Sequence, residues 1–167
     1  MSVLDRQHSH DASWRGLGQI AERVNSIVRA MAPSFLTQLV LRFGLAVPFW
    51  RSGVNKWDGF LQLNDVAVFL FSSEFKLHLP GGPHPFPAPE TMAFAAGSAE
   101  ILLPIFLVLG FGTRLAALGL LAMTLVVQLT VPSGWPIHLT WAAMALGIMA
   151  WGPGQISLDH WIGRLRA

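Results

Sequence analysis

Long runs of apolar residues dominate the chain and predict four membrane-spanning helices. The runs cover about residues 34–54, 91–110, 115–131 and 137–151. A helix needs about 20 apolar residues to cross the hydrocarbon core, so the two shorter runs should extend into their turns. The turns GFGTR and PSGWP are short, so the second and third spans, and the third and fourth, should be antiparallel neighbours. The predicted fold is all-α, an integral-membrane antiparallel four-helix bundle.

The segments before and after these runs have a different pattern. Apolar residues recur at three- and four-residue steps over residues 14–31, which is typical of an amphipathic helix on the membrane surface. A helix packed on a partner protein is the alternative interpretation. The expected organisation is a polar tail with an N-terminal amphipathic helix at 1–33, a membrane domain at 34–152 and an amphipathic tail at 153–167.

Residues 55–90 form the longest stretch between two spans. Its first part, residues 58–71, is too short and too interrupted to cross a bilayer and is expected to form an interfacial or re-entrant helix. Its second part, LHLPGGPHPFPAPE, holds five prolines and two glycines and cannot be helical.

The composition agrees with a chain that lipid covers. Hydrophobic residues make up 53% of the chain and charged residues 12%, with a mean hydropathy of +0.50. Soluble domains carry about 25% charged residues. The cations lie mostly at the ends of apolar runs rather than on one soluble face, which argues against nucleic-acid binding. The absence of cysteine excludes disulfides, thiolate metal sites and iron–sulfur clusters within this chain.

The distribution of Lys and Arg between the loops predicts the orientation. One side carries seven arginines: Arg6, Arg15, Arg23, Arg29, Arg114, Arg164 and Arg166. The other side carries Lys56 and Lys76. This bias places both termini in the cytoplasm and the 55–90 connection outside. About thirty mostly polar residues precede the first long apolar run, which does not fit a signal peptide.

Two charged residues fall inside predicted spans. Arg42 lies about 12 Å from the cytoplasmic start of the first span, and Glu100 about 13–14 Å below the outer edge of the second. In a core of about 30 Å these depths are similar, so we predict an Arg42–Glu100 ion pair. Charges within spans are often functional, but a buried pair also fixes helix register, and the structural role is the favoured one.

A second polar group is predicted near the outer surface. Its members are Arg51, Asn55, Lys56, Gln128, His138 and Trp141. If they converge, they form an outward-facing pocket suited to a quinone head group, a small anion or a peptide segment. The alternative is that the two cations only extend to the interface. His78 and His84, without cysteine or helical spacing, predict no metal site, and no catalytic residue stands out.

Three segments resemble the DoxX family of small four-helix bacterial membrane proteins. They are LRFGLAVPFWRSGVNKW, AAGSAEILLPIFLVLGFGTRLAALGLL and WGPGQISLDHWI, in an order that spans about residues 36–162. The resemblance implies a multi-pass protein of the bacterial inner membrane. The family takes its name from a subunit associated with thiosulfate:quinone oxidoreductase and terminal oxidase, and most members have no assigned reaction. The landmarks it carries over are Arg42, Arg51, Lys56, Glu100 and Arg114.

Three functions remain open from the resemblance and the polar residues. The first is a membrane subunit of a redox system, at most an oxidoreductase subunit, with quinone in the outer pocket. The second is a non-catalytic membrane anchor or assembly factor for soluble partners. The third is a small transporter component, which would need an oligomer. The expected partners are the lipid bilayer, quinone and other protein subunits, and no cofactor other than quinone is evident.

Overall fold

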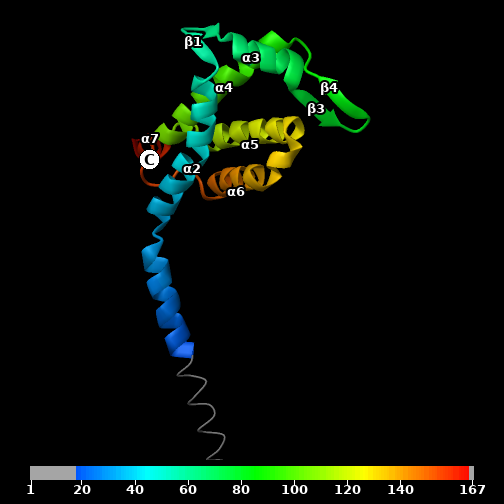
Figure 1. The fold of residues 1–167 in the computed structure, drawn as a ribbon. Helices are drawn as coiled ribbons and strands as arrows, with labels where there is room; N and C mark the ends of the chain where they lie inside the picture. Colours follow the sequence, from blue (N-terminus) through cyan, green and yellow to red (C-terminus); the bar gives the residue numbers. More distant parts are fainter. Residues whose placement is uncertain (1–17, 166–167) are drawn as a thin grey trace, which may run out of the picture. The chain divides into compact units, whose positions relative to one another are not determined.

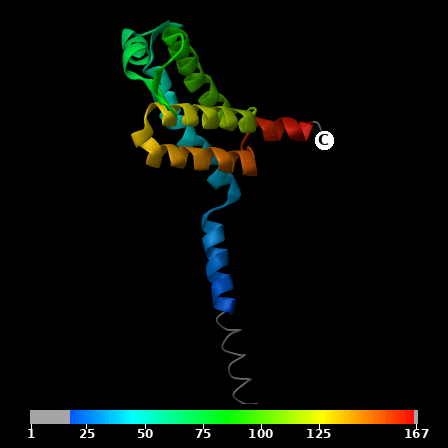
Figure 2. The same cartoon turned by 90° about the vertical axis from the view of Figure 1, so that its right-hand side faces the viewer.

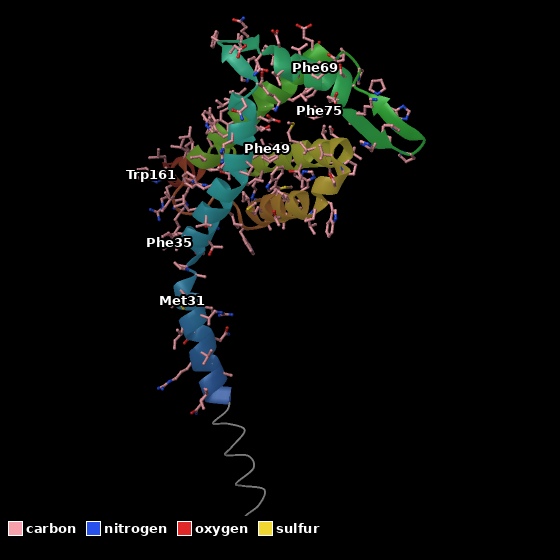
Figure 3. All side chains as sticks on the ribbon, viewed as in Figure 1. Met31, Phe35, Phe49, Phe69, Phe75 and Trp161 are labelled. Atoms are coloured by element: carbon pink, nitrogen blue, oxygen red, sulfur yellow. The ribbon has the colours of Figure 1, made fainter. Side chains whose placement is uncertain are left out.

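The structure is a computed structural model that describes residues 18–165. The chain divides into two compact units, Met1–Thr37 and Gln38–Ala167. The first contains an N-terminal helix, Gly18–Met31, whose side chains are exposed in Figure 3. The residues before it, including the predicted polar tail 1–13, lie outside the described range.

The four predicted apolar runs are helices in the structure (Figure 1). They are α2 (Ser34–Val54), which begins in the first unit, α4 (Pro89–Leu109), α5 (Thr113–Thr130) and α6 (Trp135–Trp151). By length and hydropathy, α4 and α5 each qualify as a membrane span, and the N-terminal helix and α2 qualify only as a bent pair. Within residues 18–165 the structure thus offers two or three candidate spans, and the four-span topology stays a prediction.

The helices of the second unit pack partly as the short turns predict. Helix α4 contacts α5, and α5 and α6 lie side by side as a hairpin. Helix α2 crosses this hairpin instead of running along it, as Figures 1 and 2 both show. The buried core at the crossing includes Leu45, Phe49, Leu107, Leu120 and Ile148. A regular four-helix bundle with aligned axes is therefore not confirmed.

The connection between α2 and α4 contains β structure that the all-α prediction missed. Strands β1 (Trp57–Gly59) and β2 (Gln62–Leu63) form one hairpin, and β3 (Lys76–Leu79) and β4 (Gly82–Pro85) form another. Between them lie α3 (Asp65–Phe69) and a π-helical turn, η1 (Leu70–Glu74). We call residues 57–85 the cap. It contacts α4 through α3 and η1 and α5 through β3, so it covers one side of these two helices.

The predicted interfacial helix at 58–71 is thus only half helical. Its first residues form the β1–β2 hairpin, and the helix starts at Asp65, where the side chain of Asn64 accepts a hydrogen bond from Ala67 N–H at 2.7 Å. Asparagine at this position satisfies one of the unpaired amides of a helix start. The proline-rich stretch is not helical up to Ala88, as predicted, but its last two residues, Pro89 and Glu90, begin α4.

Candidate functional site

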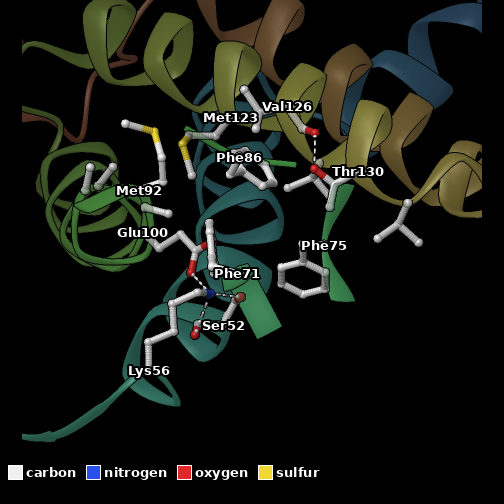
Figure 4. Close-up of a pocket in the computed structure, with 15 residues that line it drawn as sticks. Ser52, Lys56, Phe71, Phe75, Phe86, Met92, Glu100, Met123, Val126 and Thr130 are labelled. Carbon is white, nitrogen blue, oxygen red and sulfur yellow. Dashed lines mark hydrogen bonds and ion pairs between the residues drawn. The ribbon is translucent and has the colours of Figure 1, made fainter. Parts of the chain in front are cut away.

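A cavity of about 420 Å³ lies between the cap and helices α4 and α5 (Figure 4). Most of its lining is apolar, and three alanines on α4, Ala95, Ala96 and Ala99, leave room beside the helix. Polar side chains from Ser52, Lys56 and Glu100 gather at one end. The cavity therefore combines an apolar body with a confined polar end, the usual composition of a small-molecule site.

Three phenylalanines form its aromatic wall, Phe71 and Phe75 from the cap and Phe86 directly after it. The Phe71 ring lies edge-on to Phe75, with centroids 5.4 Å apart, and 5.3 Å from the Phe86 ring. The π-helical turn carries Phe71, and its closing hydrogen bond runs from Phe75 N–H to the Leu70 carbonyl at 2.7 Å. Such turns are rare in proteins overall, but where they occur they are often at functional sites. Met92 and Met123 also line the cavity, from α4 and α5.

The polar end is a buried ion pair. Lys56 Nζ lies 2.5 Å from Glu100 Oε2, and the two side chains are 14% and 6% exposed. Lys56 lies just after the end of α2, and Glu100 lies on α4. Helices α2 and α4 meet closely because Gly53 on α2 has no side chain. A Cβ atom at Gly53 would lie 2.9 Å from the Cβ of Glu100.

The predicted Arg42–Glu100 ion pair is wrong, because the structure gives both residues other partners. Arg42 is 2% exposed, and its terminal nitrogens donate to the carbonyls of Val108 at 2.9 Å, Pro153 at 2.7 Å and Ile156 at 2.8 Å. Carbonyls at and beyond helix ends have no partner within the helix, so they attract such a donor. The prediction compared depths in the membrane and did not foresee that the chain returns after α6.

The returning segment also closes the start of α5. The Asp159 carboxylate, at the start of α7 (Leu158–Leu165), accepts hydrogen bonds at 2.8 Å from the N–H groups of Gly112 and Thr113 and from the Thr113 hydroxyl. Burial by itself would raise the pKa of Asp159, but these bonds and the charge of Arg42 together lower it. We call residues 153–159 the clasp, because they connect α2, α4 and α5.

The six residues predicted to form one outer pocket lie in separate places. His138 Nδ1 is 2.8 Å from Gln128 Oε1, and its ring centroid lies 5.3 Å from that of Trp141, which also contacts Phe49. This half of the prediction is therefore a real cluster between α5 and α6. His138 and Gln128 border a second, mainly apolar hollow of about 310 Å³.

The other three members lie elsewhere. Lys56 joins Glu100 in the cavity. The Asn55 carbonyl accepts a hydrogen bond from the Asn64 side chain at 2.6 Å and helps to hold the cap. Arg51 is exposed, and its side chain makes no hydrogen bond or ion pair with any residue that the structure describes. The single predicted pocket is thus corrected to two sites, of which only the cavity is enclosed by the cap.

Sequence reasoning missed the aromatic wall of the cavity, since its phenylalanines lie in a loop without clear periodicity. The loop histidines show no shared site. His78 Nδ1 lies 3.0 Å from the Leu129 carbonyl and connects the β3–β4 hairpin to α5. Over residues 18–165, the structure contains no cluster of three or more His, Cys, Asp or Glu residues that could hold a metal ion.

Comparisons with known proteins cover the part of the chain that forms the cavity. A family model described as DoxX matches residues 37–133, which include α2 from its fourth residue, the cap, α4 and α5. A protein of Haemophilus influenzae (strain ATCC 51907 / DSM 11121 / KW20 / Rd), described only as an uncharacterized protein, is 28% identical over 144 residues, or 79% of this chain and 87% of that one. No solved structure matches the chain.

Proposed function

Because this chain belongs to the DoxX family of membrane proteins, we propose that it is the membrane subunit of a redox system and that the cavity holds the head group of a membrane quinone. The observation that carries the proposal is the cavity itself, where aromatic walls end on the buried Lys56–Glu100 pair. The proposal moves the quinone from the predicted outer pocket to this cavity.

The size and chemistry of the cavity support this ligand class. A volume of about 420 Å³ falls within the range of about 300–1,000 Å³ that is usual for small-molecule sites. A quinone ring can stack against Phe71 and Phe86, since aromatic pairs favour offset and edge-to-face packing. The two methionines supply flexible, polarisable surface that fits varied ring substituents.

Filling the cavity tests the proposal. Ala99→Leu places a larger side chain in the cavity wall, whereas Ala143→Leu makes the same change on the exposed side of α6. We expect wild-type protein and Ala143→Leu, extracted with native lipid, to retain quinone, and Ala99→Leu to lose most of it. The measurement is quinone per protein after organic extraction. Equal quinone in both variants, or none in the wild type, would contradict the proposal.

A second function, an anchor for soluble partners, is favoured by exposed apolar residues at both ends of the described chain. In the N-terminal helix, Ile20 is 62% and Ile27 61% exposed, and in α7 Trp161 is 70% exposed. Ile20→Asp with Ile27→Asp should then release a co-purified soluble partner while quinone is retained. A variant that still lies in the membrane and keeps every partner would count against the anchor.

A further inference from the structure

We infer that the polar end of the cavity selects the reduced, hydroxyl-bearing quinol over the oxidised quinone. This inference rests on the proposed function and adds a redox state to the ligand. The protein itself uses some of the hydrogen-bond donors and acceptors at the polar end, and those that remain open to a ligand determine which redox form fits.

The Lys56 ammonium has no donor left for a ligand. An ammonium carries three N–H donors. Lys56 Nζ bonds to Glu100 Oε2 at 2.5 Å, to the Ser52 hydroxyl at 3.0 Å and to the Ser52 carbonyl at 3.3 Å. Figure 4 shows the ammonium between these two residues. The cation thus holds the carboxylate in place and is not itself the group that meets the head group.

Glu100 keeps one free acceptor. An ionised carboxylate accepts hydrogen bonds and donates none. Oε2 receives Lys56, while no residue in the described range donates to Oε1. The buried side-chain atoms without a partner in that range are Arg42 Nε and Trp57 Nε1, so Oε1 is not among them. Because Glu100 is otherwise buried and lines the cavity, we place Oε1 at the cavity surface.

Ser52 adds one free donor. Its hydroxyl accepts the bond from Lys56, and its hydrogen is donated to no partner within the described residues. A hydroxyl can donate and accept at the same time. The polar end therefore offers a ligand one acceptor, Glu100 Oε1, and one donor, the Ser52 hydroxyl.

A quinol matches this pair, whereas a quinone matches half of it. A quinol hydroxyl can donate to Glu100 Oε1 and accept from Ser52. A quinone carbonyl can only accept from Ser52, and its lone pairs would face the carboxylate. Since hydrogen bonds to charged groups are among the stronger ones, we expect the quinol to bind about tenfold more tightly.

The test compares the two redox forms of one ligand on the full chain. A short-tailed benzoquinone and its chemically reduced quinol are added anaerobically to protein in lipid nanodiscs, and each Kd is measured by equilibrium dialysis. We expect about a tenfold lower Kd for the quinol in the wild type. In Glu100→Gln the advantage should disappear, since the amide can donate to the quinone carbonyl. Ser52→Ala removes the hydroxyl donor but frees one N–H of Lys56, and Glu100 Oε1 stays open, so the preference for the quinol should remain.

The outcomes separate this inference from the function on which it rests. Equal Kd values in the wild type, or tighter quinone, would overturn the quinol preference. If the quinol preference is overturned in this way but neither form binds to Ala99→Leu, the proposal that the cavity is a quinone site would stand. Binding of neither form to the wild type would overturn both proposals. The wild-type comparison needs no variant, so it holds even if Glu100→Gln does not fold.

Discussion

Two sets of charged residues lie at separate places in the second unit, Arg42 with Asp159 and Lys56 with Glu100, and their surroundings differ. At the clasp, the terminal nitrogens of Arg42 donate to three backbone carbonyls, and Asp159 accepts bonds from the start of α5. In the cavity, the Lys56–Glu100 pair leaves a carboxylate oxygen open to the cavity. Arg42 and Lys56 are fourteen positions apart in sequence, which corresponds to about 21 Å along the axis of a continuous helix.

The comparison separates charge used for architecture from charge available to a ligand. At the clasp, the one buried side-chain nitrogen or oxygen atom that has no hydrogen-bond partner among residues 18–165 is Arg42 Nε. In the cavity, Glu100 Oε1 stays open as an acceptor and the Ser52 hydroxyl as a donor beside an apolar space. We therefore expect changes at the clasp to act on stability, and changes in the cavity to act on ligand binding with a separable effect on stability.

The largest effect is expected at Arg42. Arg42→Met keeps much of the side-chain volume but removes the donor from three partly buried hydrogen bonds to carbonyls. At about 1–3 kcal/mol for each unsatisfied group, we expect a loss of about 4 kcal/mol in the free energy of unfolding. Unfolding in mixed detergent micelles measures this loss. The control is Arg51→Met, an exposed arginine on the same helix, which should change stability by less than about 0.5 kcal/mol. Equal losses in both variants would refute the role of the clasp.

The next effect is expected at Lys56. Lys56→Met leaves the Glu100 charge buried and unpaired, so we expect a loss of about 3 kcal/mol. The double variant Lys56→Met with Glu100→Met removes both charges and should return to within about 1 kcal/mol of the wild type, because buried pairs are often replaceable by apolar residues. Ligand binding should stay lost in the double variant. A double variant as unstable as the single one would show that the pair is needed for architecture, like the clasp.

A smaller effect is expected at Gly53, where the two helices meet. Gly53→Ala places a Cβ atom against Glu100 and should lower stability by about 2 kcal/mol through overpacking. The displacement of Glu100 should also weaken ligand binding in the cavity. Gly18→Ala is a suitable control, because nothing lies within 4 Å of its added Cβ. If Gly53→Ala behaves like this control, the contact between α2 and α4 is looser than the structure indicates.

The smallest effect is expected at Asp159, with a defined pH dependence. Because the folded state lowers the pKa of Asp159 below its ordinary value of 3.8, its contribution is complete above that pH and is lost as pH falls through the lowered pKa. Asp159→Asn should cost about 1 kcal/mol near pH 7, as expected for a helix cap. The difference in unfolding free energy between wild type and variant should shrink below pH 3.8. A difference that stays constant down to pH 2 would contradict this assignment.

Hydropathy was sufficient to locate the long helices of the second unit. Their ends fall within two residues of the predicted runs, because the apolar lengths and the Gly- and Pro-containing turns define them. The neighbours joined by short turns were also predictable. Periodicity treats one segment at a time, however, so it did not reveal that α2 crosses the α5–α6 hairpin.

The site itself was harder to predict. The sequence identified Lys56 and Glu100 as polar landmarks, but their pairing depends on the close contact at Gly53. Asp159 lies in WGPGQISLDHWI, one of the three segments that resemble the family, yet its role needs the return of the chain to α5. The aromatic wall comes from a π-helical turn and from the residues directly before and after the β3–β4 hairpin, for which local sequence gives weak signals.

The clasp also has a consequence for how the protein is made. Arg42 and Ile156 are 114 positions apart, so the arginine emerges from the ribosome long before its acceptor does. At synthesis rates of about 5–20 residues per second, it waits roughly 6–23 seconds for that partner. During that time its charge must be held by water, lipid head groups or a helper protein. An interrupted chain that ends before the clasp leaves Arg42 without two of its three carbonyl acceptors.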